Sequence, residues 1–246
     1  VVTDIATAEM VKYASNAFLA TKISFINEIA NLCERVGADV HEVARGMGLD
    51  GRIGSKFLHA GAGYGGSCLP KDTQALVQLA KSKGDGYELE VVEAAIRANA
   101  KQQAMMVEKI TQAIGALEGK TVGVLGLAFK PNTDDIRDSA SVKIVQAIQK
   151  RGARVRAYDP VAMDSARKLM PEIIYCEDVY ETAKGSDALI LITEWNQFRN
   201  LDLERIRKAL RSPVFIDLRN VYEPQRMKDL GFQYIGVGRG SSRSKA

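Results

Sequence analysis

Apolar residues recur at close to helical spacing through the first third of the chain. Between Asp4 and Val36 they stand at Val11, Ala14, Phe18, Phe25, Ile29, Leu32 and Val36, which predicts one long amphipathic helix. Thr3 or Asp4 is a suitable N-cap, and Gly37 is a suitable end. The pattern also predicts a short helix over 39–47 closed by Gly48, a helix over 70–83, and a long helix over 88–117 that ends near Gly119.

At Lys120 the pattern changes from helical spacing to short apolar runs. The segment 121–129, TVGVLGLAF, has the composition of a buried strand, and 139–152 that of an amphipathic helix. Further strands are predicted over 155–160, 188–193 and 214–220, with helical segments between them. Strands that alternate with helices indicate a parallel sheet covered by helices on both faces.

These patterns predict an α/β chain with its domain boundary between Gly119 and Thr121. We expect an all-helical central domain over 1–87, a connecting helix over 88–118, and a Rossmann-like, doubly wound parallel-sheet domain over 119–237. The last residues, 238–246, are basic and poor in apolar side chains, which is typical of a flexible tail.

Composition narrows the classes of function. The 246 residues are 46% hydrophobic and 26% charged, as in ordinary globular proteins, and the net charge of +4 is dispersed. This charge suits an anionic small ligand and does not indicate nucleic-acid binding. The longest aliphatic runs are too short to span a bilayer, and no signal-peptide pattern is present. We therefore expect a cytoplasmic protein, and the absence of an initiator Met suggests that the chain begins within a longer one.

The cysteines and histidines do not predict a metal site. Cys33, Cys68 and Cys176 have no metal-ligand spacing, and an odd, sparse set argues against a disulfide framework. The chain has only two histidines, His41 and His59.

A glycine-rich loop, RIGSKFLHAGAGYGGSCLPKD (52–72), delivers Cys68 to the start of a predicted helix. Pro70 suits the first helical position, so Cys68 is expected just ahead of the helix N-terminus, where unpaired N–H groups favour a thiolate. Lys71 adds a cation and Asp72 a carboxylate. This spacing predicts a nucleophilic cysteine. The alternative is a small buried hydrophobe, and the residues alone leave both open.

Gly61, Gly63 and Gly66 in this loop formally match the dinucleotide-binding fingerprint G-x-G-x-x-G. That fingerprint requires a buried strand before it and a helix directly after it, whereas the preceding segment is polar. The glycines are better explained by a sharp turn or by close approach of the backbone to a ligand.

Other candidate residues lie on the first helix and in the second domain. Lys12 and Asn16 are four positions apart and share a helix face, where they could stabilise an oxyanion; a solvated face with Glu9 pairing Lys12 is the alternative. Asp159 ends a predicted strand and could meet a ribose hydroxyl, or it could be a turn residue before Pro160.

The carboxyl ends of the predicted strands carry basic residues. The loop after the first strand contains Lys130 and Arg137, and Arg219 follows the strand over 214–220. Ligands bind at this edge of doubly wound sheets, so these cations could hold phosphate. Pairing with Asp134, Asp135 or Asp138 is the alternative for Arg137.

Three stretches carry a resemblance to a known family: KYASNAFLATKISFINEIANLCE (12–34), FLHAGAGYGGSCLPKD (57–72) and GLAFKPNTDDIRDS (126–139). In content, order and spacing they resemble the UDP-glucose 6-dehydrogenase family, within the nucleotide-sugar dehydrogenases. The resemblance covers essentially the whole chain except its tail.

The resemblance implies an oxidation of UDP-glucose to UDP-glucuronate in two steps that use two NAD⁺. Cys68 would capture the intermediate aldehyde as a thiohemiacetal, and a second hydride transfer would give a thioester for water to hydrolyse. The implied catalytic residues are Cys68, Lys12, Asn16 and Asp72, and the residues that reach the cofactor are Lys71 and Arg137. The implied substrate-binding residues are Arg52, Phe57, Leu58, Gly61, Tyr64, Gly65, Gly66, Lys130 and Arg219.

The family further implies a homodimer through the helical domain, with Arg52 crossing to the neighbouring site. Family members open with an NAD-binding Rossmann domain that this sequence does not contain, so the chain is expected to be inactive alone. Alternatives are an isolated nucleotide-sugar-binding and dimerisation fragment, or a related GDP-mannose or UDP-hexosamine dehydrogenase. A cysteine hydrolase would need a histidine base near Cys68, for which only His41 and His59 are candidates.

Overall fold

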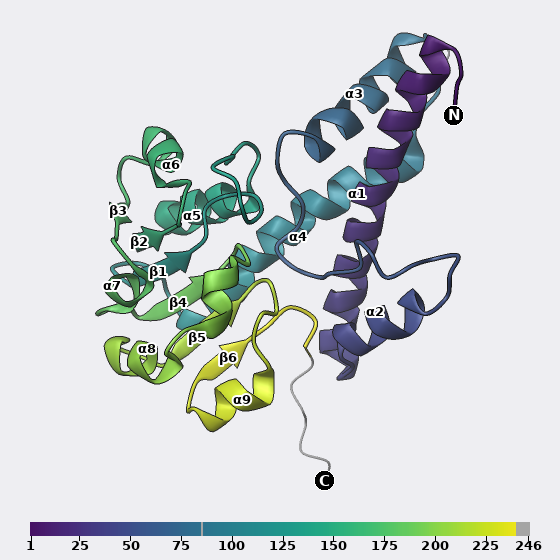
Figure 1. The fold of residues 1–246 in the computed structure, drawn as a ribbon. Helices are drawn as coiled ribbons and strands as arrows, with labels where there is room; N and C mark the ends of the chain where they lie inside the picture. The colour runs from purple at the N-terminus through teal and green to yellow at the C-terminus, as the bar shows by residue number, and fades with distance from the viewer. Residues whose placement is uncertain (85, 240–246) are drawn as a thin grey trace.

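A computed structural model describes residues 1–84 and 86–239. The chain forms a helical lobe and an α/β lobe, joined by one long helix that runs from the first into the second (Figure 1). The helical lobe consists of α1 (Ile5–Val36), α2 (Val40–Gly48), α3 (Leu69–Ser82) and most of α4 (Glu90–Ile114).

Helix α1 begins and ends at the predicted residues because both of its caps are local. The side chain of Asp4 accepts a hydrogen bond from the N–H of Thr7 at 2.9 Å, and Gly37 takes the left-handed conformation at φ +76° that glycine adopts without strain. The face that packs on α3 and α4 is buried and includes several small side chains: Ala17, Ala20, Ser24, Ile26, Asn27, Ala30 and Cys33.

Helix α4 connects the two lobes. It packs against α1 and α3 along its first part, and against α5 (Ala140–Lys150) and β5 (Val214–Asp217) further on. It is a few residues shorter than the predicted 88–117, because Gly115 leaves helical geometry at φ +84°.

The α/β lobe contains one fully parallel sheet with the strand order β3-β2-β1-β4-β5-β6. Its other elements are β1 (Thr121–Leu125), β2 (Arg154–Tyr158), α6 (Met163–Leu169), β3 (Ile174–Tyr175), α7 (Val179–Ala183), β4 (Ala188–Leu191), the 3₁₀ helix η1 (Asn196–Asn200), α8 (Leu203–Ala209), α9 (Pro224–Asp229) and β6 (Gln233–Ile235).

This strand order confirms the doubly wound fold. The chain moves one way from β1 to β2 and the other way from β4 to β5, so right-handed crossovers place α5 and α8 on opposite faces of the sheet. The central strands β1 and β4 are continuous apolar runs, and every residue of β4 is fully buried. The order reverses between β1 and β4, and ligands of such sheets bind at the carboxyl ends of the strands beside this point.

A segment after β6 returns to the helical lobe and ties the lobes together. The N–H of Gly238 donates to the Glu34 carboxylate at 2.7 Å, and its carbonyl accepts from the N–H of Val40 at 2.9 Å. A Cβ on Gly238 would lie 2.5 Å from Ala30, so only glycine allows this approach.

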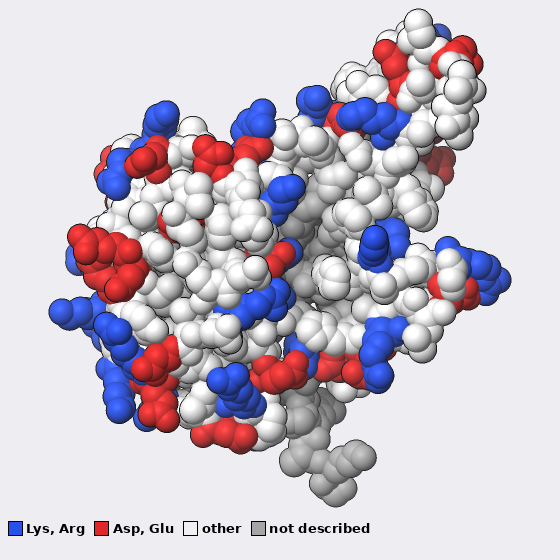
Figure 2. All heavy atoms as spheres, viewed as in Figure 1, with Lys and Arg blue, Asp and Glu red and all other residues white. Residues whose placement is uncertain are grey.

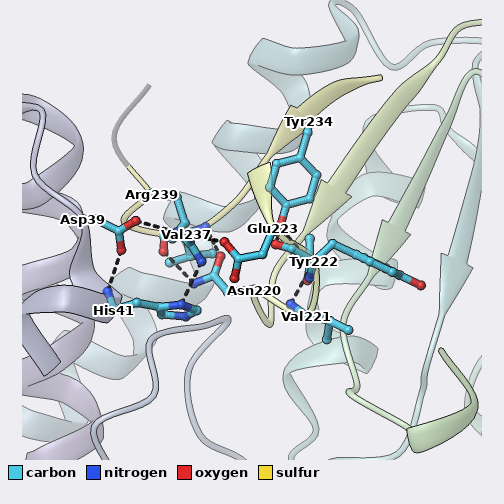
Figure 3. A network of polar contacts seen from close by, with 10 residues as sticks. Asp39, His41, Asn220, Val221, Tyr222, Glu223, Tyr234, Val237 and Arg239 are labelled. Atoms are coloured by element: carbon cyan, nitrogen blue, oxygen red, sulfur yellow. Dashed lines mark hydrogen bonds and ion pairs between the residues drawn. The ribbon is translucent and has the colours of Figure 1, made fainter. Parts of the chain in front are cut away.

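Arg239 extends this junction with three contacts (Figure 3). Its guanidinium pairs with Asp39 at 2.8 Å and with Glu223 at 2.9 Å, and its Nη1 lies 2.7 Å from Nδ1 of His41. Burial and the Arg239 charge lower the pKa of His41, which favours the neutral ring that can accept this hydrogen bond. The composition predicts a flexible tail from residue 238, but Gly238 and Arg239 are held by these contacts; residues 240–246 lie outside the described part.

Within residues 1–84 and 86–239, no helix combines the length and the apolar composition that crossing a bilayer requires.

Candidate functional site

Cys68 lies at the N-cap of α3 and is exposed to solvent. The helix begins at Leu69, so Pro70 occupies its second position and not the predicted first. The glycine-rich segment before Cys68 contains no strand, which agrees with setting aside the dinucleotide-binding interpretation of its glycines. The other two cysteines, Cys33 and Cys176, are free and buried.

Two cations lie within electrostatic reach of the Cys68 sulfur. The pKa of Lys12 is raised, chiefly by its hydrogen bond to Asp72, and a negative charge on Cys68 adds to the shift. The pKa of Arg137 is raised, chiefly by its hydrogen bond to Asp135, and Cys68 contributes there too. These cations, together with the N-terminal end of α3, make the surroundings of the Cys68 sulfur electropositive.

Asp72 brings together three of the predicted catalytic residues. Its carboxylate is 1% exposed, and its Oδ2 accepts from Nζ of Lys12 and from Nδ2 of Asn16, both at 2.6 Å. These contacts join α1 to the first turn of α3, so Lys12 is paired with Asp72 and not with Glu9. The Lys12 hydrogen bond lowers the pKa of Asp72 despite the opposing effect of burial, with Asn16 contributing further.

The second carboxylate oxygen of Asp72 is less occupied. Oδ1 accepts no hydrogen bond from any described residue, and the cation paired with it is the exposed Lys71, at 3.8 Å. Oδ1 of Asp72 is therefore a buried acceptor without a hydrogen bond from the described residues.

A cavity of about 410 Å³ lies between the two lobes. Figure 2 shows the hollow between them, with Lys and Arg side chains along it. Five of the predicted substrate-binding residues line it: Phe57, Tyr64, Gly65, Lys130 and Arg219. Leu69, the neighbour of Cys68, also lines it, which places the cysteine loop at the cavity.

Sequence reasoning did not assign a ligand contact to several residues of this wall: Ile23, Lys56, His59, Leu69 and Phe129. Lys56, His59 and Phe129 are direct neighbours of predicted residues in the sequence, and this adjacency could have identified them. No sequence feature identifies Ile23, because its spacing along the helix is that of a core residue.

Other predicted substrate-binding residues lie outside the cavity. The side chain of Leu58 is 4% exposed and belongs to the core. Arg52 is exposed and pairs with Asp50 at 2.6 Å. Gly61 and Gly66 do not line the cavity wall, although a Cβ on Gly61 would lie 3.1 Å from Nη1 of Arg219.

Gly65 and Gly66 allow the loop to touch the second lobe. A Cβ on Gly65 would lie 2.2 Å from the carbonyl oxygen of Asp138, and one on Gly66 2.6 Å from the ring of Phe129. The N–H of Gly66 also donates to the carbonyl of Arg137 at 3.0 Å. These two glycines are thus explained by close approach to protein backbone and side chain.

The cavity is electropositive. Lys130 follows β1 and Arg219 follows β5 at the carboxyl edge of the sheet, and Lys56 approaches from the helical lobe. Arg219 is held by Glu194; burial opposes ionisation of Glu194, but the Arg219 charge and hydrogen bond keep its pKa low. A diphosphate suits such a set of cations.

Asp159 is a structural residue, contrary to the interpretation of it as a ribose ligand. It is fully buried, and its carboxylate accepts from the backbone N–H groups of Leu127, Ala128, Val161 and Ala162 and from the Trp195 indole. With both oxygens occupied inside the lobe, no acceptor remains for a ribose hydroxyl. The turn interpretation is the correct one.

The residues expected to reach a dinucleotide cofactor, Lys71 and Arg137, have side chains that are more than 70% exposed. Arg137 pairs with Asp135 at 2.8 Å, as the alternative interpretation holds. Exposed cations of this kind can pair with a phosphate. The sheet does not form a dinucleotide-binding site, because the Asp159 carboxylate is already hydrogen-bonded and a loop over 126–139, instead of a helix, follows β1 directly. Over the described ranges, no three His, Cys, Asp or Glu side chains are grouped to hold a metal ion.

The chain matches two models of one protein family. The central domain of the UDP-glucose/GDP-mannose dehydrogenase family matches residues 6–101, and the UDP binding domain of that family matches residues 123–224. Residues 102–122, which include the end of α4, lie between the two matches.

Curated relatives match nearly the whole length of the chain. The chain is 53% identical over 234 residues to a UDP-glucose 6-dehydrogenase of Rhizobium meliloti, a match that covers 95% of this chain and 53% of that protein. It is 49% identical over 242 residues to a UDP-glucose 6-dehydrogenase of Bacillus subtilis, covering 98% and 52%. The chain thus spans about half the length of these relatives.

Solved structures share the fold. A UDP-glucose dehydrogenase from Pyrobaculum islandicum superposes with a TM-score of 0.85 at 39% identity, covering 96% of this chain and 51% of that one. An NDP-N-acetyl-D-galactosaminuronic acid dehydrogenase from Methanosarcina mazei superposes with the same TM-score at 30% identity, covering 95% and 51%.

Proposed function

The chain belongs to the UDP-glucose/GDP-mannose dehydrogenase family, and we propose that it forms the substrate-binding and cysteine-bearing half of an NAD-dependent UDP-glucose 6-dehydrogenase. One observation carries the proposal. An exposed cysteine at a helix N-terminus stands beside a Lys12–Asn16–Asp72 cluster and adjoins a cation-lined cavity between the lobes.

The cavity supports a nucleotide sugar as the ligand. Its volume of about 410 Å³ lies in the range of small-molecule sites, and Lys130 and Arg219 provide positive charge for the diphosphate. The aromatic rings of Phe57, Tyr64 and Phe129 provide apolar surface for the base and the sugar. Many named relatives are UDP-glucose 6-dehydrogenases, so UDP-glucose is the proposed substrate.

In the proposed chemistry the Cys68 thiolate adds to the carbonyl carbon of the intermediate aldehyde and forms a thiohemiacetal. The oxygen of that adduct gains negative charge, which N–H groups of Lys12 and Asn16 not engaged by Asp72 can stabilise. Asp72 would hold Lys12 and Asn16 in place for this role through its Oδ2. When bound, NAD⁺ accepts the hydride of each oxidation, and Lys71 and Arg137 would contact its edge.

Calorimetry on this chain tests the proposed substrate. We expect UDP-glucose and UDP to bind, because the cavity with its cations lies entirely within the described residues. Arg219→Ala should weaken both ligands by about tenfold, the usual cost of losing a charged hydrogen bond. Arg211→Ala, an exposed arginine of the same lobe, is the matched control.

The same titration separates the alternatives. Preference for GDP-mannose or a UDP-hexosamine would replace UDP-glucose as substrate. Binding without any NADH formation would describe an isolated binding fragment, and turnover by this chain alone would refute the expected inactivity. Lack of binding by UDP and UDP-glucose alike would contradict the proposed site.

We also propose that the chain forms a homodimer through α1. Val11, Phe18, Phe25 and Leu32 are spaced seven residues apart and are 45–65% exposed, so they form one apolar stripe along the helix. Phe18→Asp should convert a dimer into a monomer in sedimentation equilibrium. A wild-type chain that sediments as a monomer at micromolar concentration would rule the proposal out.

A further inference from the structure

The backbone of residues 60–64 is buried without being part of a sheet. Ala60, Ala62 and Tyr64 are at most 6% exposed, and the segment contains no strand. Buried backbone N–H and C=O groups require partners, and here the partners come from amide side chains of two helices.

Both backbone polar groups of Gly61 are hydrogen-bonded to side chains of helices. Its N–H donates to Oδ1 of Asn27 on α1, and its carbonyl accepts from Nε2 of Gln102 on α4, both at 2.8 Å. Gln102 is itself oriented by Asn31, whose Nδ2 donates to its Oε1 at 2.8 Å. This contact leaves the Gln102 NH₂ group directed at the loop.

Asn99 forms a closed pair with Tyr64. Its Oδ1 accepts from the N–H of Tyr64 at 2.8 Å, and its Nδ2 donates to the Tyr64 carbonyl at 3.0 Å. The carboxamide therefore replaces a neighbouring strand. A Cβ on Gly63, which has φ +100°, would lie 2.6 Å from Oδ1 of Asn99, so this glycine is required by the close approach of Asn99.

The segment 60–64, which these amides hold, also forms part of the cavity wall. Gly63, Tyr64 and Gly65 line it, and Cys68 follows four residues after Tyr64. The amides hold this segment from α1 and α4, while Asp138 contacts Gly65 from the other lobe. A change in the amides would therefore shift the wall and the cysteine together.

We propose that Asn99 and Gln102 are positioning residues for the nucleotide-sugar site. They act through the backbone of Gly61 and Tyr64, and they hold the cavity wall in the shape that receives the ligand. The identity of the ligand rests on the proposed function, whereas the effect on Cys68 does not.

The test uses the isosteric variants Asn99→Asp and Gln102→Glu of this chain. Each carboxylate keeps the acceptor but loses the N–H donor. Gln102→Glu removes the donor to the Gly61 carbonyl, and Asn99→Asp leaves the Tyr64 carbonyl with only the longer bond from Nε2 of Gln103, at 3.4 Å. We expect UDP-glucose affinity to fall about tenfold at pH 7.5, and the rate of Cys68 alkylation by iodoacetamide to change severalfold. Gln112→Glu, at an exposed amide of α4, should change neither by more than about twofold.

The pH dependence of the affinity distinguishes a positioning role from a general loss of stability. When the carboxyl introduced by Asn99→Asp is protonated, it regains a donor. The affinity of this variant relative to wild type at the same pH should therefore recover as the pH is lowered to about 5.5, toward the range in which a buried carboxyl takes up a proton. If Asn99→Asp does not fold, Asn99→Ala removes the two hydrogen bonds to Tyr64 without adding charge. The UDP-glucose affinity and the Cys68 alkylation rate of that variant then decide whether Asn99 is a positioning residue.

Unchanged affinity and alkylation in both isosteric variants would overturn the proposal, as would losses that follow the melting temperature and show no recovery at the lower pH. If the wild type binds no UDP-glucose, the proposed function fails, and the alkylation rates alone then support or overturn the positioning role.

Discussion

Replacing Cys68 with alanine in the full-length polypeptide is expected to lower NADH formation from UDP-glucose by about a thousandfold or more. The sulfur is the group that forms the covalent adduct in the proposed chemistry, and loss of a nucleophile removes the steps that depend on it. Binding should change little, because Cys68 is exposed at the N-cap of α3 and its side chain makes no capping hydrogen bond there. Steady-state NADH absorbance and UDP-glucose calorimetry measure the two effects separately.

The buried cysteines provide the control for this experiment. Cys176→Ala removes a free thiol that is 1% exposed and far along the chain from the proposed site, so it should lower stability slightly and leave turnover near the wild-type rate. A Cys68→Ala enzyme that keeps most of its NADH formation would disprove covalent capture of the aldehyde.

Local features of the fold were predictable from the sequence. The caps of α1 at Asp4 and Gly37 act within one helical turn, and the buried strands are continuous apolar runs. Junctions between distant segments were not predictable. The polar composition of 238–246 predicts flexibility, yet Arg239 is held by Asp39 and Glu223, which are contributed by opposite lobes.

In the candidate site, too, local features were predictable from the sequence and contacts between distant segments were not. The spacing from Cys68 to Asp72 is local, and it indicated a nucleophile near a carboxylate. Asp72 and Asp159 are both aspartates beside a turn or helix start, and their different roles depend on donors that only the tertiary structure supplies. Likewise, Asn99 stands in an ordinary helical pattern, and nothing in that pattern indicates that it pairs with the backbone of Tyr64.

The second large effect is expected from Lys12→Met, which removes the cation from a nearly buried carboxylate. Asp72 would keep Asn16 but lose the partner that lowers its pKa most, and the uncompensated carboxylate should lower the free energy of unfolding at pH 7 by more than a control substitution at an exposed lysine does. Chemical denaturation of this chain measures the loss. Lys101→Met, at an exposed lysine of α4, should change stability by less than about 0.5 kcal/mol.

The pH dependence of this loss follows from the pKa of Asp72. In the wild type the folded-state pKa is lowered below its ordinary value of 3.8, chiefly by Lys12. The pair therefore contributes its full stability above the unfolded pKa and loses it as the pH falls through the folded pKa. Without Lys12, burial is the largest remaining influence and opposes ionisation, so the folded-state pKa of Asp72 should rise above its wild-type value. The variant is then destabilised at neutral pH, and the destabilisation decreases once the carboxyl is protonated. The difference between variant and wild type should shrink from pH 7 to pH 3, and Asp72→Asn in the Lys12→Met background should recover part of it at pH 7. A difference that is equal at both pH values would show that Lys12 acts through packing and not through its charge on Asp72.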